Sequence, residues 1–443
     1  MPKFAIFKHK LMRSALSLFC LSIISYLLKY FLNAFISSQL PTSLYGAFGI
    51  TIRTLLLLSL ILLLGTNSSA IKYLSKYISK KHKKHMYSFM AWNLKVILRT
   101  FKICFLLIFT FYILIFILNA LGIAEYDFYY NILYSLWIVP IAALSILLAS
   151  YLLCNKWTVL YFLLNKIASS FFLIILFAIA IYILKIKLTY FTILIVIFIS
   201  VIMILTIEII LVNKMFRKND INIRYKMGNQ ALLIRPEWKT ESIKFISTQI
   251  VVLLIATTSL YIVKFTNSNK DLVGYYTAIL IISNMIWIIP SSLSLLIKPK
   301  VNLLTSYNKF KKFQLIINTV NKLNSTILII LYILIIIFGD KLLGSFGSKF
   351  KFYYIPLLIQ SGAFLLGSLV NPAEQTLTYC NLKKEIRVNI YELSSLIILG
   401  IPMTYVFGIT GIAIAALISI SIKAILVYSF VKKTIPIKPF TIF

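Results

Sequence analysis

The stretch TLLLLSLILLLGTNSSAIKYLSKYISKKHKKHM (54–86) joins an apolar run directly to a dense cluster of lysines. An apolar run of about 20 residues can cross the hydrocarbon core of a bilayer as a helix. Lysine and arginine gather in the cytoplasmic loops between such helices. The stretch therefore predicts a membrane-spanning helix whose C-terminal end faces the cytoplasm.

The same alternation extends over the chain of 443 residues, which contains 45 Lys and Arg against 11 Asp and Glu and is 60% hydrophobic. The basic residues lie in clusters between long apolar runs, and every second gap is nearly free of them. This distribution is typical of a multi-pass membrane protein and does not fit a nucleic-acid binder. We expect an all-α integral membrane protein of the bacterial inner membrane, in contact with membrane lipids and with no nucleic-acid partner.

We predict about twelve transmembrane helices, with both termini in the cytoplasm. The predicted spans are 14–37, 45–65, 100–122, 132–154, 164–184, 189–213, 245–264, 273–297, 319–339, 353–378, 388–407 and 411–431. The gap at 66–99 contains KYLSKYISKKHKKHMYSFM (72–90), which predicts a helix at the membrane interface. Two interpretations of it are open: a solvated topology anchor, or a contact with a lipid or a biosynthetic enzyme.

A faint internal repeat relates the two halves of the chain. Leu44-Tyr45-Gly46 opens the second predicted span, and Leu272-Val273-Gly274 opens the eighth. Parallel repeats of this kind are related by an axis along the membrane normal. We expect two six-helix lobes, 1–213 and 245–443, around a central cleft, with a cytoplasmic linker at 214–244.

The chain offers little for catalysis or metal binding. Its cysteines (Cys20, Cys104, Cys154 and Cys380) have no paired spacing, and its histidines (His9, His82 and His85) all fall in basic segments. It also lacks the phosphate-binding sequence G-x-x-x-x-G-K-[ST], which argues against a built-in ATP motor. We expect no catalytic residue, no metal site and no cofactor.

Two long stretches resemble a known family. LVGYYTAILIISNMIWIIPSSLSLLIKPKVNLL (272–304) is similar to a block of the polysaccharide and O-antigen flippases, and residues 342–419 are similar to their C-terminal half. In the second stretch the likeness rests on Ser345-Phe346-Gly347, on Asn371-Pro372 and on Gly408 and Gly411. The chain thus resembles the multidrug/oligosaccharidyl-lipid/polysaccharide exporter superfamily. It departs from the family at Ser259-Leu260-Tyr261-Ile262 and at Cys380-Asn381, where residues typical of the family are missing.

The resemblance implies a flippase for polyprenyl-pyrophosphate-linked oligosaccharides that serve surface polysaccharide (O-antigen or capsule) biosynthesis. Such a protein must hold a pyrophosphate, and cations within spans are the candidates, because charges inside a membrane are costly. The candidate substrate-binding residues are Lys29, Arg53, Lys166 and Lys423. For Lys29 and Lys166 an alternative is open, in which they reach toward an interface or pair with Glu208.

Asn371, Glu374 and Gln375 form a second candidate cluster, for a coupling cation. Pro372 removes a backbone N–H there, so we expect a broken helix with a free carbonyl. The alternative is a kink that its own side chains stabilise. We expect Glu392 to pair with Arg387 or Lys384, and Glu208 to reach toward the cytoplasm.

The expected function is therefore that of a non-enzymatic flippase for a lipid-linked oligosaccharide, with polysaccharide-assembly proteins as partners. Alternatives are a cation-coupled multidrug exporter of the same superfamily, a membrane polysaccharide polymerase and a scaffold for the synthetic machinery. The basic character of the N-terminal spans argues against the exporter, because cationic drugs need an acidic or aromatic cleft. The short predicted periplasmic loops argue against the polymerase.

Overall fold

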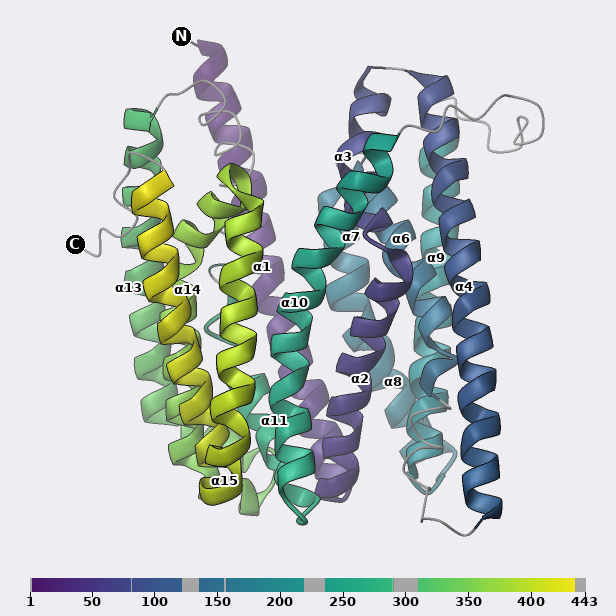
Figure 1. Ribbon diagram of the computed structural model, residues 1–443, viewed down its shortest axis with the longest axis vertical. Coiled ribbons are helices and arrows are strands. Elements are labelled where there is room, and N and C mark those ends of the chain that lie inside the picture. The colour runs from purple at the N-terminus through teal and green to yellow at the C-terminus, as the bar shows by residue number, and fades with distance from the viewer. Residues whose placement is uncertain are drawn as a thin grey trace. The chain divides into compact units, whose positions relative to one another are not determined.

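The computed structural model describes residues 2–80, 82–121, 135–154, 157–218, 236–288, 290 and 310–434, and its regular structure in these ranges is helical (Figure 1). The α-helices are α1 (Pro2–Gln39), α2 (Thr42–Leu63), α3 (Thr66–Ser79), α4 (Lys83–Ala120), α6 (Val139–Cys154), α7 (Thr158–Phe162), α8 (Ser169–Ala178), α9 (Tyr190–Lys218), α10 (Pro236–Thr266), α11 (Asp271–Ser283), α13 (Phe310–Gly344), α14 (Tyr354–Cys380) and α15 (Leu382–Thr434). Two π-helical segments, η1 (Leu163–Ala168) and η2 (Ile179–Ile183), and a 3-10 helix, η3 (Ser348–Tyr353), complete the order.

The predicted all-α membrane architecture is confirmed. Among the described residues, nine helical segments are long and apolar enough to cross a membrane, and α6 and α11 are shorter apolar helices. α15 is in fact two helices, because Gly408 interrupts it with φ 57° and ψ −134°. With α15 counted as two and α6 and α11 added, the number of spans agrees with the predicted twelve. The end of the predicted eighth span, at 291–297, lies outside the described residues.

The boundaries differ from the prediction mainly around the basic segments. α4 begins at Lys83, so the third predicted span is only the C-terminal part of a 38-residue helix. The segment predicted as one interfacial helix at 72–90 is divided between α3 and α4. Hydropathy locates the apolar part of a helix, whereas a helix continues wherever its backbone stays hydrogen-bonded, so the basic extensions were not predicted. The predicted linker at 214–244 overlaps the ends of α9 and α10.

The chain forms two compact units. Unit 1 contains residues 1–50 and 254–443, and unit 2 contains residues 51–253. This division differs from the predicted lobes, because α1 belongs with the C-terminal helices. The assignment of residues 1–213 and 245–443 to two lobes around a cleft stays a prediction.

Polar side chains of α1 fix it within unit 1. The hydroxyl of Tyr26 donates to the carbonyl of Ile281 at 2.9 Å, and the hydroxyl of Ser37 donates to the carbonyl of Phe346 at 2.9 Å. The Phe346 ring is buried and lies edge-on to Tyr30, with 5.5 Å between ring centroids. The Ser345-Phe346-Gly347 turn, which carries part of the family resemblance, thus contacts α1 directly.

The two glycines of the predicted repeat meet inside unit 1. A Cβ atom built on Gly46 of α2 would lie 2.7 Å from the backbone nitrogen of Gly274 of α11. Three residues later, a Cβ on Gly49 would lie 2.6 Å from Cγ2 of Thr277. The N-terminal ends of α2 and α11 therefore pack backbone to backbone, at positions that the repeat makes equivalent.

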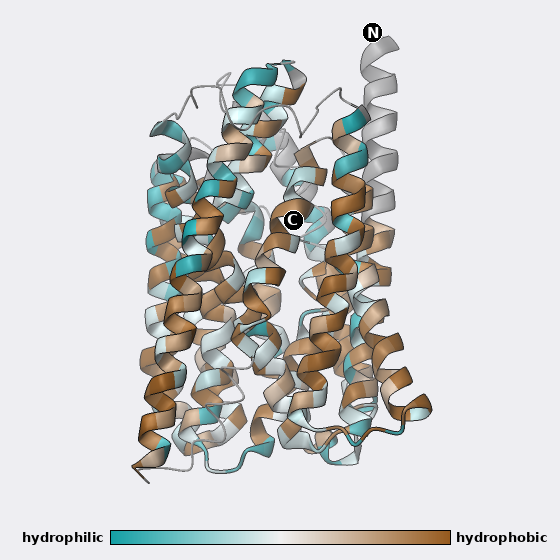
Figure 2. Cartoon of the chain, turned by 90° about the vertical axis from the view of Figure 1, so that its right-hand side faces the viewer, coloured by the Kyte–Doolittle hydropathy of each residue, from teal (hydrophilic) through white to brown (hydrophobic). Residues whose placement is uncertain are grey.

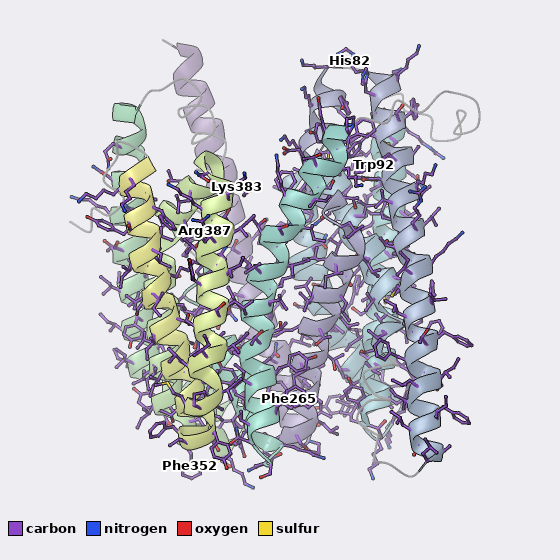
Figure 3. All side chains as sticks on the ribbon, viewed as in Figure 1. His82, Trp92, Phe265, Phe352, Lys383 and Arg387 are labelled. Atoms are coloured by element: carbon purple, nitrogen blue, oxygen red, sulfur yellow. The ribbon has the colours of Figure 1, made fainter. Side chains whose placement is uncertain are left out.

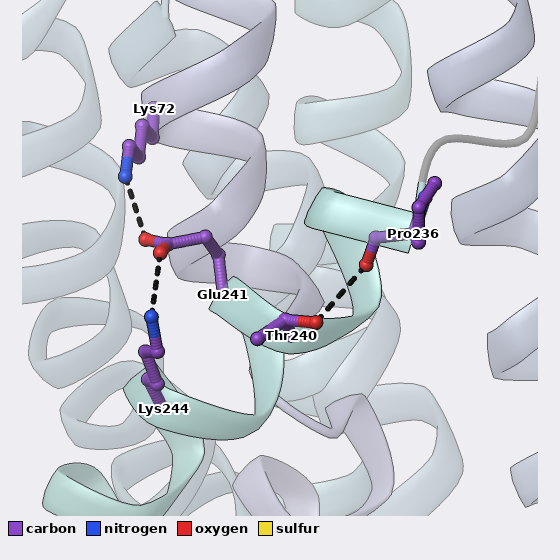
Figure 4. Close-up of polar contacts among 5 residues, drawn as sticks. All are labelled: Lys72, Pro236, Thr240, Glu241 and Lys244. Carbon is purple, nitrogen blue, oxygen red and sulfur yellow. Dashed lines mark hydrogen bonds and ion pairs between the residues drawn. The ribbon is translucent and has the colours of Figure 1, made fainter.

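In unit 2 the start of α10 is packed against α3 and α4. Trp238 is fully buried, donates from its indole nitrogen to the hydroxyl of Tyr77 at 3.0 Å, and lies edge-on to Phe89. Glu241 then bridges Lys72 and Lys244 at 2.6 and 3.1 Å (Figure 4). The short α3 helix thus packs onto the start of α10, which was predicted to be a linker.

The outer surfaces of the helices suit a bilayer. α4 exposes a continuous series of large apolar side chains, among them Phe105, Leu106, Phe109 and Phe116. Figure 2 shows hydrophobic residues over most of the length of the helices and hydrophilic residues gathered toward their ends. In unit 1, Lys383 and Arg387 lie toward one end, and Phe265 and Phe352 lie at the other (Figure 3). The side of the membrane that each end faces stays a prediction.

Candidate functional site

A proline within α14 organises the polar interior of unit 1. Pro372 has no N–H to donate to the carbonyl of Ser368, four residues earlier. The amide of Asn324, on α13, donates to that carbonyl at 3.0 Å instead. α14 continues through Pro372 from Tyr354 to Cys380, so the predicted break of this helix is wrong. The freed carbonyl is used in a contact between α13 and α14.

Three charged side chains meet at Glu374, two residues after Pro372. The ammonium of Lys423, in the second half of α15, lies 2.8 Å from Oε1 of Glu374 and 3.1 Å from Oε2 of Glu392. The exposed fractions of the three side chains are 11, 9 and 6%. We refer to Glu374, Glu392 and Lys423 as the ion triad. It connects α14 with both halves of α15 and places two negative charges and one positive charge inside a membrane-spanning unit.

Further polar residues lie on the helices that carry the triad. On α15, Glu385, Asn389 and Glu392 are spaced i, i+4 and i+7, and therefore share one face. Both side-chain polar atoms of Asn389 and Oε1 of Gln375 are buried without a hydrogen-bond partner among the described residues. Asn371, three residues before Glu374, is also buried. Buried polar atoms without partners are rare in proteins, and their occurrence on the same helices as the ion triad makes this region a candidate site.

Unit 2 holds a buried carboxylate of its own. Glu208, on α9, is fully buried and accepts hydrogen bonds from the hydroxyl of Ser145 at 2.6 Å and from the amide of Asn165 at 3.2 Å. Asn165 lies in the π-helical segment η1, a type of irregularity that is frequent at functional sites. The expectation that Glu208 reaches toward the cytoplasm is therefore wrong, because neutral donors from α6 and η1 hold it in place.

The predicted cations occupy different environments. Lys29 lies on α1 in unit 1 and is exposed, whereas Arg53, on α2 in unit 2, is half-buried. Lys166 lies in η1 and is exposed. Lys423 contacts another predicted site residue, Glu374. The roles of all four in substrate binding stay predictions.

The sequence prediction missed the partner of Glu392. We expected Arg387 or Lys384, since both are close in sequence, but the carboxylate contacts Lys423 on the other half of α15. The i, i+4, i+7 spacing of Glu385, Asn389 and Glu392 was a usable signal. It places the three side chains on one face of the helix, and a polar face within a membrane span points inward.

No protein-family model and no curated protein sequence matches the chain. Solved structures match it over nearly its whole length. An inward-facing multidrug resistance transporter of the MATE family, in the MOP superfamily, has a TM-score of 0.71 at 13% identity, with 95% of this chain and 97% of that chain covered. The lipid II flippase MurJ in an inward closed conformation has a TM-score of 0.65 at 16% identity, with 95 and 88% covered. The Vibrio cholerae MATE transporter VcmN in the bent form has a TM-score of 0.57 at 14% identity, with 98% of each chain covered. The chain therefore has the fold that these transporters share.

Proposed function

We propose that this chain is a flippase that moves polyprenyl-pyrophosphate-linked oligosaccharide units across the bacterial inner membrane for surface polysaccharide biosynthesis. The substrate is moved and not chemically altered. The likeness to a lipid II flippase supports the fold that such a task needs. The choice of an anionic substrate rests on the positive charge of the first membrane-spanning segments.

The distribution of charge at the start of the chain carries the proposal. The first 124 residues contain no Asp or Glu, although they include three of the membrane-spanning segments. Lys29 and Arg53 lie within the spans Phe19–Gln39 and Thr42–Leu63. A guanidinium can bind two oxygens of a phosphate at once, and its charge compensates the dehydration of the anion. Arg53 is accordingly the principal proposed contact, with Lys29 and Lys166 as further cations.

The region of Asn371, Glu374 and Gln375 is the proposed place of energy coupling. Glu374 is buried and takes part in the ion triad. A change in the occupancy or charge of such a site shifts the balance between two conformations of a transporter. Lys423, a proposed substrate-binding residue, is linked to this region, because its ammonium contacts Glu374 directly.

The competing candidate is a cation-coupled multidrug exporter. The match to a MATE transporter favours it, as does the buried Glu208, an acid that a cationic drug or a coupling proton could engage. Glu208→Gln discriminates between the two functions. It should abolish drug efflux by an exporter, because the charge is removed, and leave flipping of an anionic lipid intact.

The direct test uses the purified protein in liposomes that contain a polyprenyl-pyrophosphate-linked oligosaccharide. Flipping is measured as the fraction of the saccharide that an external glycosidase can reach. Arg53→Ala should lower the rate at least about tenfold, the effect of losing roughly 1.4 kcal/mol of binding, and Arg53→Lys should recover part of it. Arg99→Ala, at an exposed arginine on α4, is the control. Normal flipping by Arg53→Ala, or efflux of a cationic dye in place of flipping, would refute the proposal.

A further inference from the structure

The ion triad resembles a site for a monovalent cation, because two carboxylates approach one positive charge. Here the positive charge is the ammonium of a side chain and not a free ion. Two carboxylates, from Glu374 and Glu392, approach one ammonium at 2.8 and 3.1 Å. All three side chains are nearly inaccessible. Carboxylate oxygens in a region of low dielectric attract a positive charge strongly, and here Lys423 supplies it.

Two buried amide oxygens without a partner belong to residues close in sequence to the two carboxylates of the triad. Oδ1 of Asn389, one turn before Glu392, and Oε1 of Gln375, next to Glu374, are buried without a hydrogen bond among the described residues. Small hard cations prefer carboxylate and amide oxygens as ligands. The same interior would therefore suit a free alkali cation if the ammonium were not there.

We propose that Lys423 is a tethered counter-ion, which takes the position of a free monovalent cation between Glu374 and Glu392 and makes this site independent of Na⁺, K⁺ and Li⁺. The inference rests on the proposed role of the Glu374 region in coupling, and it names the residue that determines the ion specificity of that region. It does not depend on the identity of the transported substrate.

The proposal has a specific consequence for variants. Lys423→Ala removes the ammonium and leaves two buried carboxylates without their cation, on helices that also carry the unpartnered amide oxygens of Gln375 and Asn389. A buried charge that loses its partner is strongly unfavourable, so the variant should recruit a cation from solution. A purely structural ion triad makes a different prediction, namely that the variant is destabilised to the same extent in every salt.

The experiment compares thermal unfolding of the full-length protein in lipid nanodiscs in NaCl, KCl, LiCl and choline chloride at equal ionic strength. The wild type should have the same Tm in all four salts. Lys423→Ala should have a Tm at least about 2 °C higher in one alkali salt than in choline, because a ligand that binds only the folded state stabilises it. Binding of ²²Na⁺ to the same samples provides a second readout.

Two control variants make the result specific. Lys423→Ala combined with Glu392→Gln removes one of the two carboxylates and should lose most of the gained response. Lys322→Ala, at an exposed lysine of α13 in the same unit, should show no response to the cation. Lys423→Gln, which keeps a long polar side chain without the charge, replaces Lys423→Ala if the latter does not fold in any salt.

Each outcome of the experiment either supports or overturns the proposal. A response in Lys423→Ala or Lys423→Gln that depends on Glu392, together with a wild type that does not respond, supports the proposal. A folded Lys423 variant without any cation response overturns it. So does a wild type that binds ²²Na⁺ and loses this binding in Glu374→Gln. None of these readouts involves transport, so they are distinguishable from a failure of the proposed flippase function.

Discussion

Gly46 and Gly274 lie so close together that a Cβ atom on Gly46 would be 2.7 Å from the backbone nitrogen of Gly274. Real Cβ atoms essentially never approach a neighbour this closely, so one of the two helices would have to move. The obstacle is backbone, which cannot rotate away as a flexible side chain can. These two positions correspond in the predicted repeat, and both lie in unit 1.

We therefore predict that Gly46→Ala destabilises the protein by about 1–3 kcal/mol, the usual penalty for an overpacked interior. Thermal unfolding of the purified protein should show a lower Tm than that of the wild type. Gly362→Ala is the matched control, because a Cβ there would meet its nearest atom, the hydroxyl oxygen of Tyr332, at an ordinary 3.5 Å. Equal Tm values for the two variants would contradict the tight packing of α2 against α11.

The contact between Asn324 and the carbonyl of Ser368 is predicted to depend on Pro372. Asn324→Ala should cost about 1–3 kcal/mol, because it leaves a buried carbonyl without a donor. With Pro372→Ala as the background, the N–H of residue 372 can donate to that carbonyl, and Asn324→Ala should cost much less. A double-mutant cycle on unfolding free energies measures this coupling. Strictly additive costs would show that Asn324 acts independently of the proline.

At the junction of α3 and α10 we predict that close backbone packing contributes more to the free energy of unfolding than the ion pairs of Glu241 do. Gly65 has φ 74°, and a Cβ on it would collide with the carbonyl oxygen of Ser242. Gly65→Ala should therefore cost at least about 1–2 kcal/mol from the left-handed backbone alone. Glu241→Gln should cost about 1 kcal/mol or less, since Lys72 and Lys244 are half exposed to solvent. Fluorescence of the nearby Trp238 can follow both transitions, and the reverse order of effects would contradict this ranking.

The orientation of unit 1 in the membrane can be tested at two exposed residues that lie toward its opposite ends, Phe352 and Lys383 (Figure 3). The distribution of lysine predicts that Lys383 faces the cytoplasm and Phe352 the periplasm. In a background without the native cysteines, Phe352→Cys should react with a membrane-impermeant maleimide in intact cells. Lys383→Cys should react only after the cells are opened. The opposite labelling pattern would invert the predicted topology.

Hydropathy and charge predicted most of the fold because the bilayer imposes a fixed length and a fixed bias of lysine on every span. The predicted repeat singled out Gly46 and Gly274, and the missing backbone N–H singled out Pro372. The ion triad was only partly predicted. Glu374 and Lys423 were each recognised as costly inside a membrane, but their pairing joins α14 to the second half of α15. Periodicity defines the face of a helix that a side chain occupies, and it carries no information on which distant helix that face meets.

The attachment of α1 within unit 1 has a consequence for biosynthesis. The hydroxyl of Tyr26 bonds to a carbonyl 255 residues later in the chain, and Ser37 bonds to one 309 residues later. At synthesis rates of about 5–20 residues per second, the first of these partners leaves the ribosome roughly 13 to 50 s after Tyr26. Throughout that interval α1 has none of its final neighbours from α11 and the turn after α13. These bonds of α1 therefore form only after the second half of the chain has been translated.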